Sequence, residues 1–342
     1  MSGDHIPYAE GRSSQARALE AAVPSLREQV SGQQENGRFR GPGPVFVAIG
    51  ASFAAASAPV WTLRNRGIHA WRLVAGDYPL PFPVSSHPLI GISQSGRSTE
   101  TLDVLASVER PLRYVVTNAR RSPLAAAADA ALWLGDVPDS FASTIGYTAT
   151  LVGLGMIADA WDGGAIDPTW DVLPEVVADL ERSTSARSAE LAVAFLGRTT
   201  ADVVGGGPAI GSAEAGALLF REVARVPAAA LSTRQYLHGP MESAGSSVHV
   251  LIGDTREIEV ARTLSEAGHP VILITAATVS ADERLQVVRL PAFPPSPRAV
   301  LEAVVMQVIA GAVAEQAGVD IDAFVFHNAD TKVVDPAPAS AR

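Results

Sequence analysis

The chain has 342 residues, of which 47% are hydrophobic and 18% charged, with a formal net charge of −10 and no cysteine. This length and composition predict a globular protein of about two domains and exclude a disordered chain. The negative charge argues against nonspecific binding to nucleic acids or anionic membranes, and the lack of cysteine excludes disulfides, thiolate metal sites and a cysteine nucleophile.

The first half of the chain alternates short apolar runs with helical patterns. A polar stretch at 1–14 is followed by a helical pattern over 15–31 and a connector rich in Gly and Pro at 32–44. Unbroken apolar strands that alternate with helices are typical of a parallel sheet covered on both faces, which predicts a doubly wound α/β domain. The predicted strands lie at 45–50, 69–76, 87–93, 112–118 and 131–136.

The second half repeats this pattern, with predicted strands at 201–207, 248–254, 270–276 and 285–291 and a long apolar helix at 297–318. We therefore predict two doubly wound α/β domains in tandem. The expected organisation is an N-terminal tail (1–22), a first domain (23–165), a helical linker (166–195) and a second domain with a C-terminal tail (196–342). We see no signal-peptide core and no membrane span, and we expect a cytoplasmic protein.

The sequence GISQSGRS (91–98) places small polar side chains between the third predicted strand and a helix. We call residues 93–98 the Ser-rich corner. Ligands of doubly wound sheets bind beyond the carboxyl ends of the strands, and a helix N-terminus there favours phosphate. Ser93, Gln94, Ser95 and Ser98 could thus bind a phosphate, with Ser52 reaching the same crevice. The alternative is that these serines only cap the helix.

Other ligand motifs are missing from the sequence. There is no GxxxxGK[ST] loop, and the glycines at 205–216 do not follow the GxGxxG spacing, which argues against an NAD-dependent oxidoreductase. No HxxxH or HExxH pair occurs, so we expect no metal site and no cofactor.

The chain resembles the sugar isomerase (SIS) family. SQSG at 93–96, EAGALLFREV at 214–223, LHGP at 237–240 and HNADTKVVD at 327–335 are similar to motifs in the isomerase half of glucosamine-6-phosphate synthase. The resemblance implies two flavodoxin-like SIS domains and a sugar-phosphate ligand. It also implies a homodimer with active sites near the subunit interface.

The resemblance further implies roles for single residues. Ser52, Ser93, Gln94, Ser95 and Ser98 match phosphate-binding positions. Glu222 matches the glutamate that moves a proton between C1 and C2 of the sugar, and His238 matches the histidine of ring opening. Lys332, the only lysine of the chain, falls near the family's C-terminal lysine. Ala142, Ser143 and Thr144 match a substrate-binding loop.

The chain also departs from the family pattern. The loop that usually reads ASTK reads ASTI here, so Ile145 replaces a lysine, and Leu219 replaces another. The earlier glutamate of the helix is Ala215, with Glu214 one step away. We see no glutaminase domain in this sequence, so we do not expect this chain alone to make glucosamine 6-phosphate from glutamine. An aldose–ketose isomerase or an aminosugar-phosphate deaminase that uses free ammonia remains.

The chemistry needs one base over the C1–C2 bond, and a carboxylate whose pKa is raised by burial suits that task. Glu222, on a mostly apolar helix, is the candidate, although without the resemblance its residue type favours a surface glutamate that pairs with Arg221 or Arg225. Ring opening needs a group that titrates near neutral pH, such as His238. Lys332 could bind phosphate, form a Schiff base or stabilise an enolate. The alternative function is a sugar-phosphate sensor without turnover, which the lost lysines favour.

Overall fold

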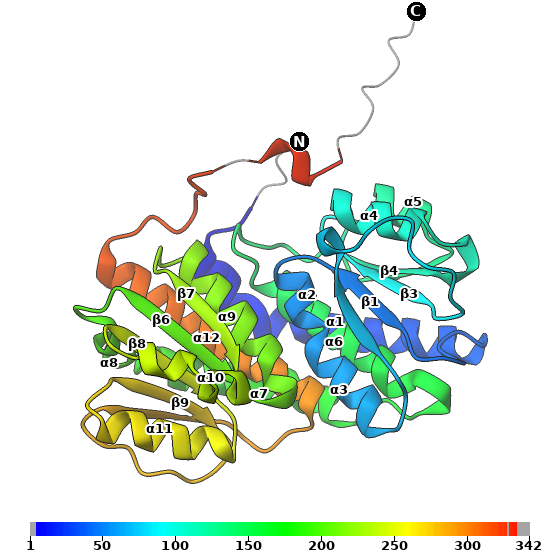
Figure 1. Ribbon diagram of the computed structural model, residues 1–342. Coiled ribbons are helices and arrows are strands. Elements are labelled where there is room, and N and C mark those ends of the chain that lie inside the picture. The colour runs from blue at the N-terminus through cyan, green and yellow to red at the C-terminus, as the bar shows by residue number, and fades with distance from the viewer. Residues whose placement is uncertain (1–4, 327, 334–342) are drawn as a thin grey trace, which may run out of the picture.

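Each half of the chain folds around one five-stranded parallel sheet (Figure 1). The computed structural model describes residues 5–326 and 328–333. The first sheet contains β1 (Val45–Ala48), β2 (Trp71–Val74), β3 (Leu89–Ile92), β4 (Arg113–Thr117) and β5 (Ala130–Trp133). The second contains β6 (Thr200–Gly205), β7 (Ala228–Ser232), β8 (Ser247–Ile252), β9 (Val271–Thr275) and β10 (Leu285–Arg289).

The two sheets have the same topology. Their strand orders are β2-β1-β3-β4-β5 and β7-β6-β8-β9-β10, which in each half is the order 2-1-3-4-5 of a flavodoxin-like sheet. The connections therefore change direction between β1 and β3 in the first sheet and between β6 and β8 in the second. These two switch points are where doubly wound sheets bind ligands. The predicted fold class, two doubly wound parallel sheets in tandem, is confirmed.

Helices cover both faces of each sheet, which is why the central strands β1, β3, β8 and β9 are buried along their whole lengths. The helices of the first half are α1 (Tyr8–Glu35), α2 (Ala51–Ala55), α3 (Ser57–Asn65), α4 (Thr99–Ala106), α5 (Pro123–Ala127) and α6 (Ile145–Ala160). Those that follow are α7 (Thr169–Ser185), α8 (Ser188–Ala192), α9 (Ile210–Glu222), α10 (Thr233–Leu237), α11 (Arg256–Glu266) and α12 (Pro295–Ala317).

The N-terminal helix differs from the sequence prediction. The helix predicted at 15–31 is present but begins earlier, because residues 8–14 of the polar stretch also belong to the 28-residue helix α1, which packs against α6 and α7. The Tyr8 hydroxyl donates to the backbone carbonyl of Gln307 at 2.9 Å, and Leu19 and Gln15 are buried. This stretch is largely polar, so its sequence does not indicate the few buried contacts that stabilise the start of the helix. The domain boundaries at 23, 166 and 196 stay predictions.

The sequence analysis missed β7, at the edge of the second sheet. Its sequence, AAALS, is dominated by alanine, which has little preference for strands. The strand forms because it pairs in parallel with all of β6 from Ala201 to Gly205. Tertiary pairing thus overrides local preference here.

The two halves share one hydrophobic core. Its largest cluster of buried side chains contains residues from both sheets and from α1, α6, α7, α9 and α12. Helix α12 is long and apolar enough to span a membrane, but 89% of its most apolar window is buried inside the protein. Arg72 on β2 also forms a bidentate ion pair with Glu214 on α9 and so ties the halves together.

The chain after α12 crosses from the second half back over the first, as Figure 1 shows. The backbone N–H of Val333 donates to the carbonyl of Arg97 at 2.9 Å, and Lys332 pairs with Ser98 in an isolated antiparallel bridge. The segment 328–333 therefore lies on the Ser-rich corner.

Candidate active site

The serines of the Ser-rich corner do not cap the helix that follows. Ser98 occupies the N-cap position of α4, yet its hydroxyl makes no capping hydrogen bond. Instead its Oγ lies 3.0 Å from the Oγ of Ser93, and both side chains are buried. The first-turn N–H groups of α4 consequently lack a side-chain acceptor from the cap, which is the condition that favours an anion at a helix N-terminus.

Glycine often lets a ligand approach the backbone closely, but Gly96 makes room for a neighbouring side chain of the protein. Its φ is +63°, and a Cβ at this position would lie 2.1 Å from the Oγ of Ser122. Ser122 caps α5 by accepting a hydrogen bond from the N–H of Ala125 at 3.3 Å. Gly96 thus lets the Ser-rich corner pack against the start of α5.

Asp139 joins the Ser-rich corner to the 142–144 loop. Its Oδ2 accepts hydrogen bonds from the amide Nε2 of Gln94 and from the Oγ of Ser143, each at 2.5 Å. Its Oδ1 accepts from the backbone N–H of Thr144 at 2.8 Å and from the Thr144 hydroxyl at 3.0 Å. The sequence analysis missed Asp139. An Asp followed by Ser and Thr just before a helix is a signal for such a turn.

The 142–144 loop presents one of its three predicted residues to a cavity. Ala142 and Thr144 are buried, and the hydroxyl of Ser140 bonds to both of them. Ser143 lines a cavity of about 20 Å³ between the halves, which we call the Glu222 cavity. Its walls are Ala51, Ser143, Tyr147, Ala215, Leu218, Leu219 and Glu222.

Glu222 is the last residue of α9 and the only acidic residue in the wall of the Glu222 cavity. Burial in this apolar setting raises the pKa of Glu222 to about 7, and the nearby Arg225 opposes that rise. A carboxyl with such a pKa can both take and return a proton near neutral pH. The surface-glutamate alternative therefore does not describe this residue.

Positions 145 and 219, where the resemblance implies lysines, carry apolar side chains. Leu219, one turn before Glu222 on α9, lies in the cavity wall, whereas Ile145 is buried at the start of α6 and is not part of that wall. A lysine at position 219 would bring positive charge near the Glu222 carboxylate, which would lower its pKa. Glu214 does not take the place of the glutamate that the resemblance implies at position 215. Glu214 is paired with Arg72 and is not part of the cavity wall.

Lys332 reaches the Ser-rich corner from the far end of the chain. Its Nζ lies 3.5 Å from the Oγ of Ser95. Burial of the ammonium group lowers the pKa of Lys332, and the charge of Glu100 opposes that change. The structure thus places a lysine with weakened proton affinity beside the predicted phosphate position.

Ser52 and His238 occupy different surroundings. Ser52 lies in the first turn of α2, next to Ala51 of the Glu222 cavity, and is half-buried. His238 ends α10 beyond the edge strand β7, where it is exposed, and it is not part of the wall of the Glu222 cavity. The chain by itself therefore does not bring His238 to Glu222.

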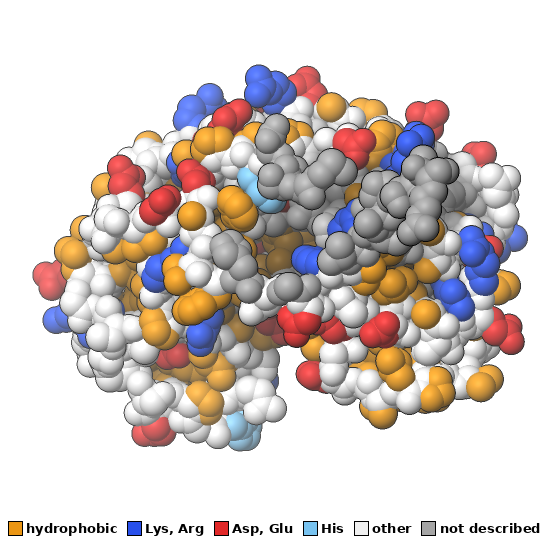
Figure 2. Space-filling model, turned by 90° about the horizontal axis from the view of Figure 1, so that it is seen from above, with side chains coloured by type: hydrophobic (Ala, Val, Ile, Leu, Met, Phe, Trp, Pro, Cys, Tyr) orange, Lys and Arg blue, Asp and Glu red, His pale blue; other side chains and the backbone are white. Residues whose placement is uncertain are grey.

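Seen from above, a notch separates the two halves along one edge of the molecule, and acidic side chains lie along its border (Figure 2). Among residues 5–326 and 328–333, no group of three or more His, Asp or Glu side chains is arranged to hold a metal ion.

The fold is shared with proteins that act on sugar phosphates. The chain aligns with tagatose-6-phosphate ketose/aldose isomerase from Escherichia coli at TM-score 0.78 and 19% identity, covering 93% of this chain and 96% of the other. It aligns equally well with the C-terminal domain of glucosamine-fructose-6-phosphate aminotransferase from Francisella tularensis, at TM-score 0.78, 18% identity and coverages of 94% and 99%.

A third similar structure is glucosamine-6-phosphate deaminase from Thermotoga maritima, at TM-score 0.68, 17% identity and coverages of 90% and 96%. No protein-family model and no curated protein sequence matches the chain. The chain therefore has the tandem fold of phosphosugar isomerases, and the predicted resemblance to the SIS family is confirmed at the level of the fold.

Proposed function

We propose that this protein is a phosphosugar enzyme, either an aldose–ketose isomerase or an aminosugar-phosphate deaminase that uses free ammonia. The observation that carries the proposal is Glu222, a half-buried residue whose carboxyl has its pKa raised to about 7, in a cavity that Ser143 also lines. The same fold in proteins named for these activities supports it.

Glu222 performs the proton transfer in this proposal. Its carboxylate removes the proton from C2 of the open-chain aldose, which leaves an enediol, and returns that proton to C1 to give the ketose. For an aminosugar the intermediate is an enolamine, and hydrolysis of the resulting imine releases ammonia. The pKa near 7 suits a group that acts first as base and then as acid.

The Ser-rich corner holds the phosphate of the substrate. The hydroxyls of Ser93, Ser95 and Ser98 and the first turn of α4 supply donors, and Lys332 supplies positive charge. Gln94 is oriented by Asp139, whose other contacts fix Ser143 beside Glu222. The phosphate and the reacting carbons are thereby placed by one connected set of side chains.

Substrate binding requires the walls to move. The Glu222 cavity, at about 20 Å³, has room for a single water molecule but not for a sugar. The cavity walls come from the first half and from α9 of the second half, so a displacement of the halves along their seam would open it.

His238 fits the proposal as a residue supplied by a second copy of the chain. It is exposed and lies outside the cavity of its own chain. In a symmetric dimer with sites near the interface, the loop that carries it could reach the partner's Glu222 and open the sugar ring there.

A sugar-phosphate sensor is the second candidate. The apolar, buried positions of Ile145 and Leu219 favour it, because the lysines found there in the SIS family are absent. Both candidates bind a sugar phosphate, and only the enzyme converts it.

The test is to incubate the purified protein with glucosamine 6-phosphate, with fructose 6-phosphate plus ammonia, and with tagatose and galactosamine 6-phosphates. We expect turnover of at least one of them and its loss in Glu222→Gln. Glu266→Gln, at an exposed position on α11, is the matched control and should keep full turnover. Clean binding without turnover of any substrate, with affinity unchanged in Glu222→Gln, would establish the sensor instead.

A further inference from the structure

The second half has its own, larger cavity at the carboxyl edge of its sheet, with a volume of about 590 Å³. We call it the second crevice. It lies at the switch point between β6 and β8, where doubly wound sheets bind ligands. Its volume falls in the range of pockets that hold small molecules. No residue of the Glu222 cavity lines it, so it is a separate place in the fold.

The second crevice is not a copy of the Ser-rich corner. Gly253, Asp254 and Thr255 follow the central strand β8 where Ser93, Gln94 and Ser95 follow β3. Asp254 is held by a bidentate ion pair with Arg298 and accepts hydrogen bonds from the hydroxyl of Thr275 and the N–H of Ala276. A phosphate in the same position would meet a carboxylate, which opposes its binding there.

Glu257 places a second carboxylate in the wall. The residue is only 5% exposed, and its Oε1 accepts a hydrogen bond from the hydroxyl of Thr233 at 2.5 Å. A Cβ at Gly206 would lie 2.5 Å from this carboxylate, and one at Gly253 would lie 2.2 Å from it. Both glycines thus make room for the carboxylate of Glu257.

A carboxylate has more acceptor sites than the single contact of Glu257 with Thr233 uses. Glu257 can therefore accept further hydrogen bonds from a ligand in the crevice. Hydroxyl groups are donors of this kind. They are uncharged, so they would not compete with Arg298 for its ion pair with Asp254. The wall is therefore suited to a polyhydroxylated molecule.

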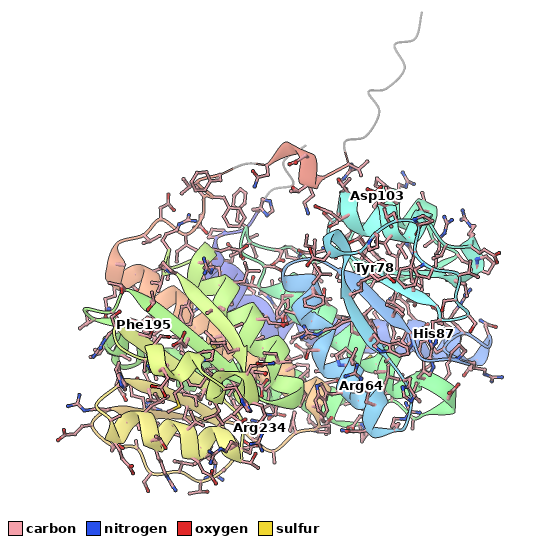
Figure 3. The ribbon with its side chains drawn as sticks, viewed as in Figure 1. Arg64, Tyr78, His87, Asp103, Phe195 and Arg234 are labelled. Atoms are coloured by element: carbon pink, nitrogen blue, oxygen red, sulfur yellow. The ribbon has the colours of Figure 1, made fainter. Side chains whose placement is uncertain are left out.

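The other walls supply an aromatic face and a free cation. Trp61, on α3 of the first half, is 36% exposed and stands over Gly207, and Phe293 adds a second ring. Such rings pack against the C–H face of a sugar. Arg234 is exposed and has no ion-pair or hydrogen-bond partner among the described residues. Figure 3 shows it near the seam between the halves.

We propose that the second crevice is a binding site for a sugar that carries one phosphate, distinct from the site at Glu222. The ring packs on Trp61, its hydroxyls donate to Glu257, and the phosphate pairs with Arg234. Because Trp61 belongs to the first half and the polar groups to the second, the ligand bridges the two halves. This inference does not rest on the proposed catalytic function.

The experiment measures glucose 6-phosphate binding by calorimetry and by tryptophan fluorescence. The wild type should bind two equivalents, and Ser95→Asp, which blocks the Ser-rich corner, should bind one. In that background Arg234→Ala and Glu257→Gln should each weaken the remaining binding by about tenfold or more. Arg262→Ala, at an exposed position on α11 outside the crevice, should leave it unchanged.

The fluorescence change locates the ligand. It should vanish in Trp61→Phe and persist in Trp71→Phe, whose indole is similarly exposed but lies outside the crevice. Glucose alone and inorganic phosphate alone should bind much more weakly than glucose 6-phosphate. The proposal is overturned by no binding to Ser95→Asp, by residual binding that survives Arg234→Ala, or by phosphate alone binding as tightly. A single equivalent in the wild type that Ser95→Asp keeps and Arg234→Ala abolishes supports this proposal and contradicts phosphate binding at the Ser-rich corner. Absence of turnover in the wild type leaves it intact.

Discussion

The side-chain amide of Gln94 donates a hydrogen bond of 2.5 Å to Asp139, and the same carboxylate oxygen accepts one from Ser143. This pair connects the end of β3 to the loop that begins α6. It therefore sets the distance between the predicted phosphate position and the Glu222 cavity.

Asp139→Ala should weaken both stability and ligand binding. The change leaves the N–H of Thr144 and the amide of Gln94 without their acceptor, so the free energy of unfolding should fall by about 2 kcal/mol. The affinity for a sugar phosphate should fall with it. Urea denaturation and calorimetry measure the two effects. Asp103→Ala, at an exposed position on α4, is the control and should behave like the wild type.

Glu222→Gln should stabilise the protein at high pH only. The pKa of Glu222 is about 7 in the folded state and 4.5 in the unfolded state. The folded state of the wild type is therefore most stable, relative to the unfolded state, below pH 4.5, and it loses this stability as the pH rises through 7. Glutamine does not titrate. The variant should therefore match the wild type at pH 4 and exceed it by roughly 3 kcal/mol at pH 8. Equal differences at both values of pH would show that burial does not raise this pKa.

Leu219→Lys should lower the pKa of Glu222 by about one unit or more, because positions three apart on a helix are neighbours and opposite charge favours the ionised carboxyl. Titration of the Glu222 carboxyl by NMR measures the shift without relying on turnover. Leu219→Met keeps the side chain neutral and should leave the pKa near 7. An unchanged pKa in Leu219→Lys would mean that the introduced ammonium turns away from the cavity.

Lys332 should form an imine with a ketose phosphate. Its lowered pKa increases the fraction of free amine, and it is the only lysine, so borohydride reduction in the presence of fructose 6-phosphate can label no other side-chain amine. Peptide mapping should find the adduct at Lys332, and Lys332→Arg should show none there. If the protein converts the substrate but no imine adduct forms at Lys332, Lys332 acts only through its positive charge.

Mixing two inactive variants tests the position of His238. If His238 acts on the partner's site, a heterodimer of Glu222→Gln and His238→Asn contains one intact site, and an equal mixture should regain roughly a quarter of wild-type turnover. If both residues act within one chain, every site in the mixture carries a substitution and no turnover returns. Co-purification through two different affinity tags confirms that heterodimers form.

The fold followed from local patterns wherever strands are buried on both faces. The runs that contain β1, β3, β8 and β9 are apolar throughout, because both of their faces are covered. The same reasoning failed for β7 and for residues 8–14, whose side chains are alanine-rich or polar. Strand β7 forms because it pairs with β6, and the start of α1 forms because it packs in the tertiary structure. Local sequence preferences do not predict such distant partners.

The sequence alone determined the tandem doubly wound fold and the place of the Ser-rich corner. Buried strands and a strand-to-helix turn depend on residues that are neighbours in the sequence, so local patterns predict them. Only the tertiary structure decided that Ser98 bonds to Ser93 rather than capping α4, and that Asp139 organises Gln94 and Ser143. It alone brought Lys332 to Ser95 across 237 positions and raised the pKa of Glu222. Burial and long-range contacts depend on how the two halves pack together, and no short stretch of sequence contains that information.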